Sequence, residues 1–166
     1  MTYRHKHITI SFLIILTFTC SFQSFGQDAK NKPGLNSDSV AVVQTINEFT
    51  DAFTNCNWER FTECFADDAT AFFPPSAKFP YRANNKIEIE NIFKGVFENA
   101  RKQKSKPPYI DIHPKDLKIQ MSGSAAIVTF LLYDPDLLGR RTIVLKKDND
   151  KWKIIHLHAS GINISK

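Results

Sequence analysis

The sequence has little cysteine, little glycine and no apolar run long enough to cross a membrane. Its 166 residues include 3 cysteines and 6 glycines. This cysteine content is too low for a disulfide scaffold, and the chain contains neither an internal repeat nor a glycine-rich phosphate loop. Hydrophobic residues make up 42% of the chain, which excludes a disordered protein. The length favours one globular domain, since two would each be unusually small.

The N-terminus has the three parts of a secretory signal. Arg4 and Lys6 make a basic start, Ile8–Phe18 is an apolar stretch, and Ser24–Gly26 supplies small residues of the kind that a signal peptidase reads. The apolar stretch is too short to span a bilayer core of about 30 Å as a helix. We expect a signal peptide over 1–26, export to the periplasm or the extracellular space, and no stable membrane insertion.

Two features of the sequence bear on a lipid anchor and on nucleic-acid binding. Cys20 would carry a lipid anchor if it lay in a lipobox, but Thr17 and Thr19 stand where a leucine-like residue and a Gly or Ala are usual. We therefore expect no lipidation. Removing 1–26 lowers the formal net charge from +5 to +3, because 20 basic residues then face 17 acidic ones. That charge is weak support for binding a polyanion, so no nucleic-acid partner is expected.

Apolar spacing predicts three helices in the first part of the domain, after a polar linker over 27–38. Apolar residues recur at three- and four-residue intervals in a helix that begins at Asp38 or Ser39, and again over Asn85–Lys104. Asn57 is placed to cap a short helix over Trp58–Ala66, and a strand over Thr70–Phe73 follows it. Cys56 and Cys64 lie about two helical turns apart, too far for a disulfide, and are predicted to be free thiols.

The second part of the chain alternates with a period of two residues, which is typical of strands. The predicted strands are a short one at Tyr109–His113, then Asp116–Met121, Ala125–Tyr133, Arg140–Lys147 and Lys151–Ser160. Short turns between them indicate antiparallel pairing. The fold class is α+β, with a strongly curved antiparallel sheet and three N-terminal helices packed on one side. The other face needs a cover, and dimerisation through the sheet would supply one.

The last predicted strand carries the richest group of polar side chains. Strict alternation would place five residues on one face, namely Trp152, Ile154, His156, His158 and Ser160. An apolar lining with a few polar groups is typical of a pocket wall. The two histidines have three open interpretations. They could ligate a metal with His113 or Asp67, His158 could act as an acid or base, or both could be polar lining or hydrogen-bonded structural residues.

Three passages between Val40 and Gly161 resemble the nuclear transport factor 2-like superfamily in its SnoaL-like form. They are Asn57–Phe61 followed by Asp68–Pro74, Ile112–Pro114, and the ending Lys151–Gly161 with its Trp152, His156 and His158. The ending most resembles the association domain of calcium/calmodulin-dependent protein kinase II and its stand-alone bacterial relatives. We assign the domain to 39–164.

The resemblance implies a cone-shaped fold with a pocket, and a homodimer or larger ring. It also implies an arginine in the pocket from the strand before the last turn, but Ile143 stands at that position. Arg140 and Arg141 come two or three residues earlier, and register decides whether either of them reaches the pocket. The superfamily includes isomerases that use a tyrosine and acidic residues, and Tyr81, Tyr133, Asp67 and Asp68 are present without a diagnostic motif. Asp67 and Asp68 fit a cap or turn better.

These observations predict a protein that binds a small polar or anionic organic ligand, without a metal or cofactor. The expected pocket residues are Trp58, Phe72, Tyr81, Trp152, His156, His158 and Ser160, with Arg141 as the charge partner. Two alternatives stay open. One is a metal-free isomerase or dehydratase, similar to ketosteroid isomerases, with His158 as general base. The other is an oligomerisation module with a vestigial pocket.

Overall fold

The structure is a computed structural model that describes residues 37–74 and 82–164. The predicted signal peptide, Cys20 and most of the linker lie outside these residues. Three helices are present: α1 (Ser37–Thr54), α2 (Trp58–Glu63) and α3 (Lys86–Gln103). The side chains of Asn57 and Asn85 accept hydrogen bonds from the backbone N–H groups of Arg60 and Glu88 and so cap α2 and α3. The three predicted helices are confirmed.

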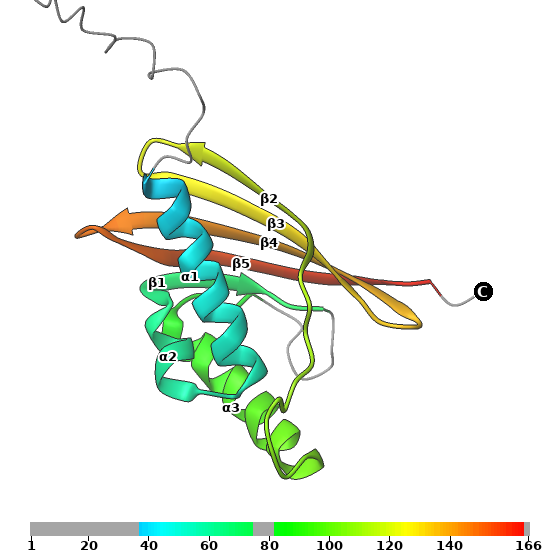
Figure 1. The fold of residues 1–166 in the computed structure, drawn as a ribbon. Coiled ribbons are helices and arrows are strands. Elements are labelled where there is room, and N and C mark those ends of the chain that lie inside the picture. The colour runs from blue at the N-terminus through cyan, green and yellow to red at the C-terminus, as the bar shows by residue number, and fades with distance from the viewer. Residues whose placement is uncertain (1–36, 75–81, 165–166) are drawn as a thin grey trace, which may run out of the picture. The chain divides into compact units, whose positions relative to one another are not determined.

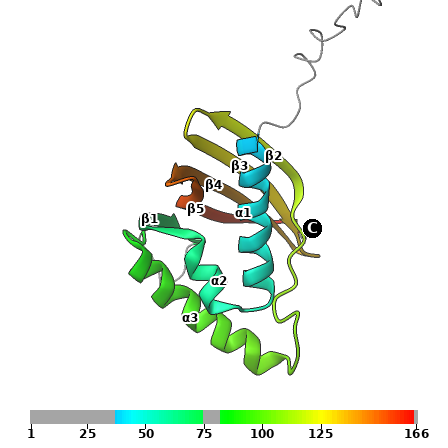
Figure 2. The ribbon, with the colours of Figure 1, turned by 60° about the vertical axis from the view of Figure 1, so that its left-hand side comes forward.

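Five strands form one curved sheet that is not closed into a barrel (Figures 1 and 2). Its order is β1-β5-β4-β3-β2. The strands are β1 (Phe65–Phe72), β2 (Lys115–Ser122), β3 (Ala125–Tyr133), β4 (Leu137–Asp148) and β5 (Lys151–Asn163). The last four strands pair antiparallel, whereas β1 pairs parallel to β5. The α+β fold is confirmed, but the sheet is mixed rather than purely antiparallel, because the chain crosses over from β1 through α3 before β2 begins.

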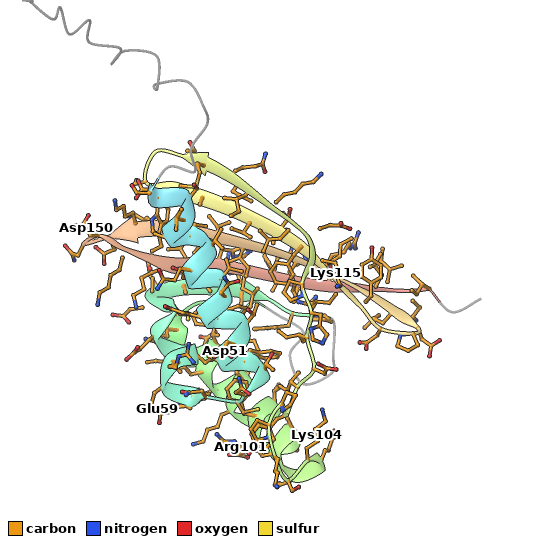
Figure 3. The ribbon with its side chains drawn as sticks, viewed as in Figure 1. Asp51, Glu59, Arg101, Lys104, Lys115 and Asp150 are labelled. Carbon is orange, nitrogen blue, oxygen red and sulfur yellow. The ribbon has the colours of Figure 1, made fainter. Side chains whose placement is uncertain are left out.

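The predicted strand over Tyr109–His113 is wrong. The backbone N–H groups of Tyr109 and Ile110 donate to the carbonyl oxygen of Thr54 at the end of α1, at 3.0 and 3.1 Å, instead of to a strand. Prolines on both sides of this segment also limit ladder hydrogen bonding. The segment therefore runs from α3 past the end of α1 to the start of β2, close to Lys115 (Figures 1 and 3).

The helices cover one face of the sheet and hold an aromatic core. Phe61 of α2 is fully buried, and its ring centroid lies 4.7 Å from that of Phe93 and 5.5 Å from that of Phe49. Cys56 and Cys64 are buried free thiols, as predicted. Among the described residues no helix is both long and apolar enough to cross a membrane.

The basic end of α3 contacts protein atoms. The Arg101 Nη2 atom donates to the Cys56 carbonyl oxygen at 2.7 Å, and the guanidinium lies over the Tyr109 ring. Arg101 and Lys104 stand at the end of α3, distant from the sheet (Figure 3). These contacts tie the segment after α3 to the helices.

A β-bulge in β5 sets which side chains point toward the helices. Ile154 pairs with Leu145 of β4, but the next pair is His156 with Val144, so Ile155 is an extra residue. The buried residues of β5 accordingly change from Trp152 and Ile154 before the bulge to Leu157 and Ala159 after it. We call the side of the sheet that faces the helices the inner face and the opposite side the outer face.

The predicted shared face of β5 is therefore wrong. His156, His158 and Ser160 lie on the outer face, because one extra residue reverses the side-chain alternation beyond it. On that face His156 Nδ1 lies 2.8 Å from Thr70 Oγ1, and the Phe72 ring contacts both histidine rings at centroid distances of 5.7 and 5.9 Å.

Because of the bulge, we expect two neighbouring alanine substitutions to lower the free energy of unfolding by very different amounts. Leu157→Ala should lower the free energy of unfolding by about 2–4 kcal/mol, because it leaves a cavity in the core. His158→Ala should change it by less than about 0.5 kcal/mol, because that side chain is exposed. Urea unfolding of both variants measures the difference. Equal losses, or a larger loss for His158→Ala, would contradict the bulge.

We expect His156 to make the folded protein less stable in weak acid. Burial lowers the pKa of His156 below its usual value, and the nearby charges of His158 and Arg82 act in the same direction. The unfolded chain therefore takes up the proton first, so stability is full above about pH 6.5 and falls toward the folded-state pKa. His156→Asn should show a smaller loss of melting temperature than wild type between about pH 7 and pH 5. Parallel pH profiles for the two proteins would rule out this contribution.

Candidate functional site

A cavity of about 480 Å³ lies between the inner face of the sheet and the helices. Its volume is within the usual range for small-molecule sites, about 300–1,000 Å³. Most of its lining is apolar and comes from α1, α3, β3 and β5, including Phe53, Phe93, Phe130 and Leu157. The polar groups among the described lining residues are few: Arg141 of β4, Tyr133 and Asp134 at the end of β3, and Asp111 and His113 of the segment before β2. Such a lining favours a ligand with an apolar body and a small number of charges.

Arg141 is a half-buried cation without an acidic partner among the described residues. Its Nη1 atom donates to the carbonyl oxygens of Arg140 and Ser160 at 2.9 and 3.1 Å. Burial lowers the pKa of Arg141 from its ordinary value, but an arginine stays charged in proteins. The N–H groups on Nε and Nη2 have no hydrogen-bond partner within the described part of the chain. Neither nitrogen is fully buried. They are available to an anion.

Gly139 makes room for this guanidinium. A Cβ atom at Gly139 would lie 3.3 Å from Arg141 Nη1 and 3.3 Å from the Leu132 Cβ. Both distances are tighter than ordinary van der Waals contact, so a side chain there would push against the arginine. The absence of a Cβ at Gly139 lets the guanidinium lie over the backbone of β4.

The loop before β2 contributes a second polar pair at the cavity. His113 Nε2 lies 2.9 Å from Asp111 Oδ1, and both side chains are largely exposed. When the histidine is neutral, this contact places its hydrogen on Nε2 and leaves Nδ1 as the acceptor. From the sequence, His113 was expected only as a metal ligand, and no pattern pointed to Asp111.

The predicted site residues fall into separate regions of the molecule. Arg141 lines the cavity on the inner face, and its role as a charge partner for a ligand stays a prediction. Phe72 contacts both His156 and His158, but on the outer face of the sheet. The structure therefore does not bring these aromatic and histidine side chains together with Arg141.

The remaining predicted residues lie elsewhere. Trp152 lines a polar hollow of about 530 Å³ beside Glu48 and Cys64, between α1, α2 and the β4–β5 turn. Trp58 lines a groove of about 310 Å³ with Phe97 and Arg101. Tyr81 lies outside the described residues. Binding roles for these side chains stay predictions, and the cavity around Arg141 is the site that combines an apolar lining with an unpaired charge.

Potential metal ligands do not gather in residues 37–74 and 82–164, where no group of three His, Cys, Asp or Glu side chains could hold an ion. His113 pairs with Asp111, whereas His156 contacts Thr70 on the outer face. Asp67 is fully exposed and lies 3.9 Å from Lys86 Nζ. The three-ligand arrangements considered from the sequence are thus not assembled.

Two features of the sequence indicate which face of the sheet the side chains of β5 and Asp134 belong to. Apolar residues of β5 occupy even positions at Trp152 and Ile154 and odd positions from Ile155 to Ala159, which is the pattern that one extra residue produces. The hairpin residue Asp134 keeps the parity of Phe130 and Leu132, so it belongs to the inner face.

Solved structures with the same fold support the assignment of the architecture. An NTF2-like protein of unknown function from Pseudomonas putida KT2440 is similar over 80% of this chain and 99% of its own, with a TM-score of 0.65 and 16% identity. A candidate dehydratase of the NTF2-like family from Streptomyces avermitilis is similar over 75% and 96%, with a TM-score of 0.62 and 18% identity. A candidate ketosteroid isomerase from Shewanella frigidimarina is similar over 72% and 94%, with a TM-score of 0.59 and 22% identity.

The family follows from the sequence itself. Residues 42–165 match the family model of the SnoaL-like domain. No curated protein matches the sequence. The closer resemblance to the kinase association domain stays a prediction. The curved, unclosed sheet with helices on one face is the NTF2-like architecture, and the chain belongs to the SnoaL-like domain family.

Proposed function

We propose that this protein is an exported, homo-oligomeric SnoaL-like domain that binds a small anionic organic ligand in the cavity under its sheet. Arg141 carries the proposal, because it is a half-buried guanidinium with no acidic partner among the described residues and it lines a largely apolar cavity. A half-buried charge is only partly solvated, and an anion that reaches the free donors of Arg141 would compensate for the lost hydration. The apolar lining would take the rest of the ligand.

The outer face of the sheet supports the proposed homo-oligomer. Large apolar side chains stay exposed there, including Phe72 at 44%, Ile127 at 41% and Ile162 at 43%. At the centre of the face Thr129 pairs with Thr142, and the charged side chains of Lys118 and Arg140 lie beside this pair. Exposed apolar surface of this kind is typical of an interface, and the helices are all on the other side (Figure 2).

A second candidate function is a metal-free isomerase or dehydratase, and the names of two structural neighbours favour it. His158 was the base expected from the sequence, but it lies on the outer face. Among the described residues of the cavity, His113 is the only histidine. A base acting on a ligand held by Arg141 would therefore be His113, with Asp111 orienting its ring.

The anion site predicts a difference between two neighbouring arginines. Arg141→Gln should weaken binding of 3-phenylpropanoate by roughly 10- to 100-fold, because Arg141 is the only cation among the described residues that line the cavity. Arg140→Gln is the matched control, since that side chain is exposed on the outer face, and binding should stay unchanged. Isothermal titration calorimetry measures both, with uncharged 3-phenylpropanamide as the reference ligand.

Gly139→Ala adds a variant that keeps the charge and displaces it. The new methyl group would press on Arg141 Nη1, so 3-phenylpropanoate should bind more weakly while 3-phenylpropanamide changes less. The proposal would be wrong if carboxylate and amide bound equally to the wild type, or if Arg140→Gln weakened binding as much as Arg141→Gln.

The homo-oligomer predicts that a charge at the centre of the outer face separates the subunits. Thr142→Lys should raise the dissociation constant of the dimer roughly 100-fold, because two lysines would be buried near each other. Asn47→Lys, on an exposed position of α1, should leave the assembly unchanged. Sedimentation velocity across a dilution series measures both. A wild-type protein that is monomeric at high concentration would refute the assembly.

A further inference from the structure

The cavity around Arg141 contains charges of both signs. Its cation is Arg141, and its carboxylates are Asp111 and Asp134. Asp111 is engaged by His113 at 2.9 Å. The Asp134 side chain makes no hydrogen bond or ion pair within the described residues, although its backbone N–H donates to the Leu137 carbonyl oxygen at 2.9 Å. The cavity thus offers a free cation and a free carboxylate.

The strand register places these two free charges close to each other. Leu132 of β3 is paired with Gly139 of β4, and the Arg141 guanidinium lies over Gly139. Asp134 lies one residue beyond β3, but its backbone N–H and carbonyl groups pair with those of Leu137 and continue the ladder. Two residues from Leu132 thus correspond to about 6.6 Å along the hairpin and to the same face of the sheet. Such a span suits a ligand whose own two charges are on adjacent groups, each making a charge-assisted hydrogen bond of about 2.8 Å.

The charge balance separates two classes of ligand. A simple carboxylate would gain one partner, Arg141, but would lie near two carboxylates of the cavity lining. A zwitterion would pair its carboxylate with the guanidinium and its ammonium with Asp134, so neither of the protein charges would be left without a partner. Because Asp134 is exposed to solvent, the second ion pair adds a modest preference over an analogue that lacks the ammonium group.

We propose that the cavity selects a compact zwitterion with an apolar side chain, which is the chemical class of an apolar α-amino acid. The ligand carboxylate binds Arg141, its ammonium binds Asp134, and its side chain packs against Phe53, Phe93 and Leu157. This inference rests on the anion site proposed above and adds the second charge and the class of ligand.

Three ligands of similar shape test the inference. L-Phenylalanine has both charges, 3-phenylpropanoate lacks the ammonium group, and 2-phenylethylamine lacks the carboxylate. Isothermal titration calorimetry on the folded protein should show L-phenylalanine binding roughly tenfold tighter than either analogue. Asp134→Asn should remove the tighter binding of L-phenylalanine relative to 3-phenylpropanoate, without weakening the binding of 3-phenylpropanoate. Asp136→Asn, at an exposed position of the same turn, is the matched control and should keep the preference.

The outcomes separate this inference from the anion site. Equal affinities for L-phenylalanine and 3-phenylpropanoate in the wild type, or an unchanged preference in Asp134→Asn, would overturn the zwitterion and leave the anion site intact. Tight binding of 2-phenylethylamine that does not depend on Arg141 would also overturn it. Failure of all three ligands to bind would refute both. Thermal unfolding of Asp134→Asn, expected to match wild type, shows that the variant is folded.

Discussion

The extra residue in β5 decides what lies beneath the sheet and what lies on its outer surface. Because Ile155 has no partner on β4, every side chain beyond it changes face. Leu157 and Ala159 then complete the apolar lining of the cavity, and the two histidines pass to the outer face. The parallel pairing with β1 depends on the same shift, since Ala71 meets Leu157 on the buried side while Phe72 meets His158 on the exposed side. The bulge therefore arranges the core, the cavity and the proposed interface together.

Arg141 determines the electrostatics of the cavity, because its half-buried positive charge has no carboxylate partner among the described residues. Two carboxylates line the same cavity, yet Asp111 is engaged by His113 and neither it nor Asp134 forms an ion pair with Arg141. A carboxylate from the protein at that point would neutralise the arginine and remove the reason for an anion to bind. The space above Gly139 instead keeps the guanidinium accessible from the cavity. The chemistry of the site follows from this free cation more than from the volume of any hollow.

Much of the fold was predictable from the sequence, because the periodicity of α1 and α3, the caps Asn57 and Asn85 and the strand at Ala125–Tyr133 are local signals. The site was less predictable, because it depends on register. Strict alternation placed His156 and His158 in a pocket, and the bulge reverses them. The mixed sheet and the path before β2 also depend on contacts between residues distant in the chain, such as those of Tyr109 with Thr54. Arg141 was identified because the resemblance pointed to an arginine on that strand.

The central claim is that a ligand binds at Arg141 on the inner face and not at the histidines on the outer face. An NMR titration with 3-phenylpropanoate that follows the Arg141 Nε–H signal and the ring signals of His156 and His158 tests this claim most directly. The account predicts a saturable shift of the Arg141 signal at ligand concentrations that leave both histidine rings unchanged. Saturable shifts of the histidine rings with an unchanged Arg141 signal would contradict it.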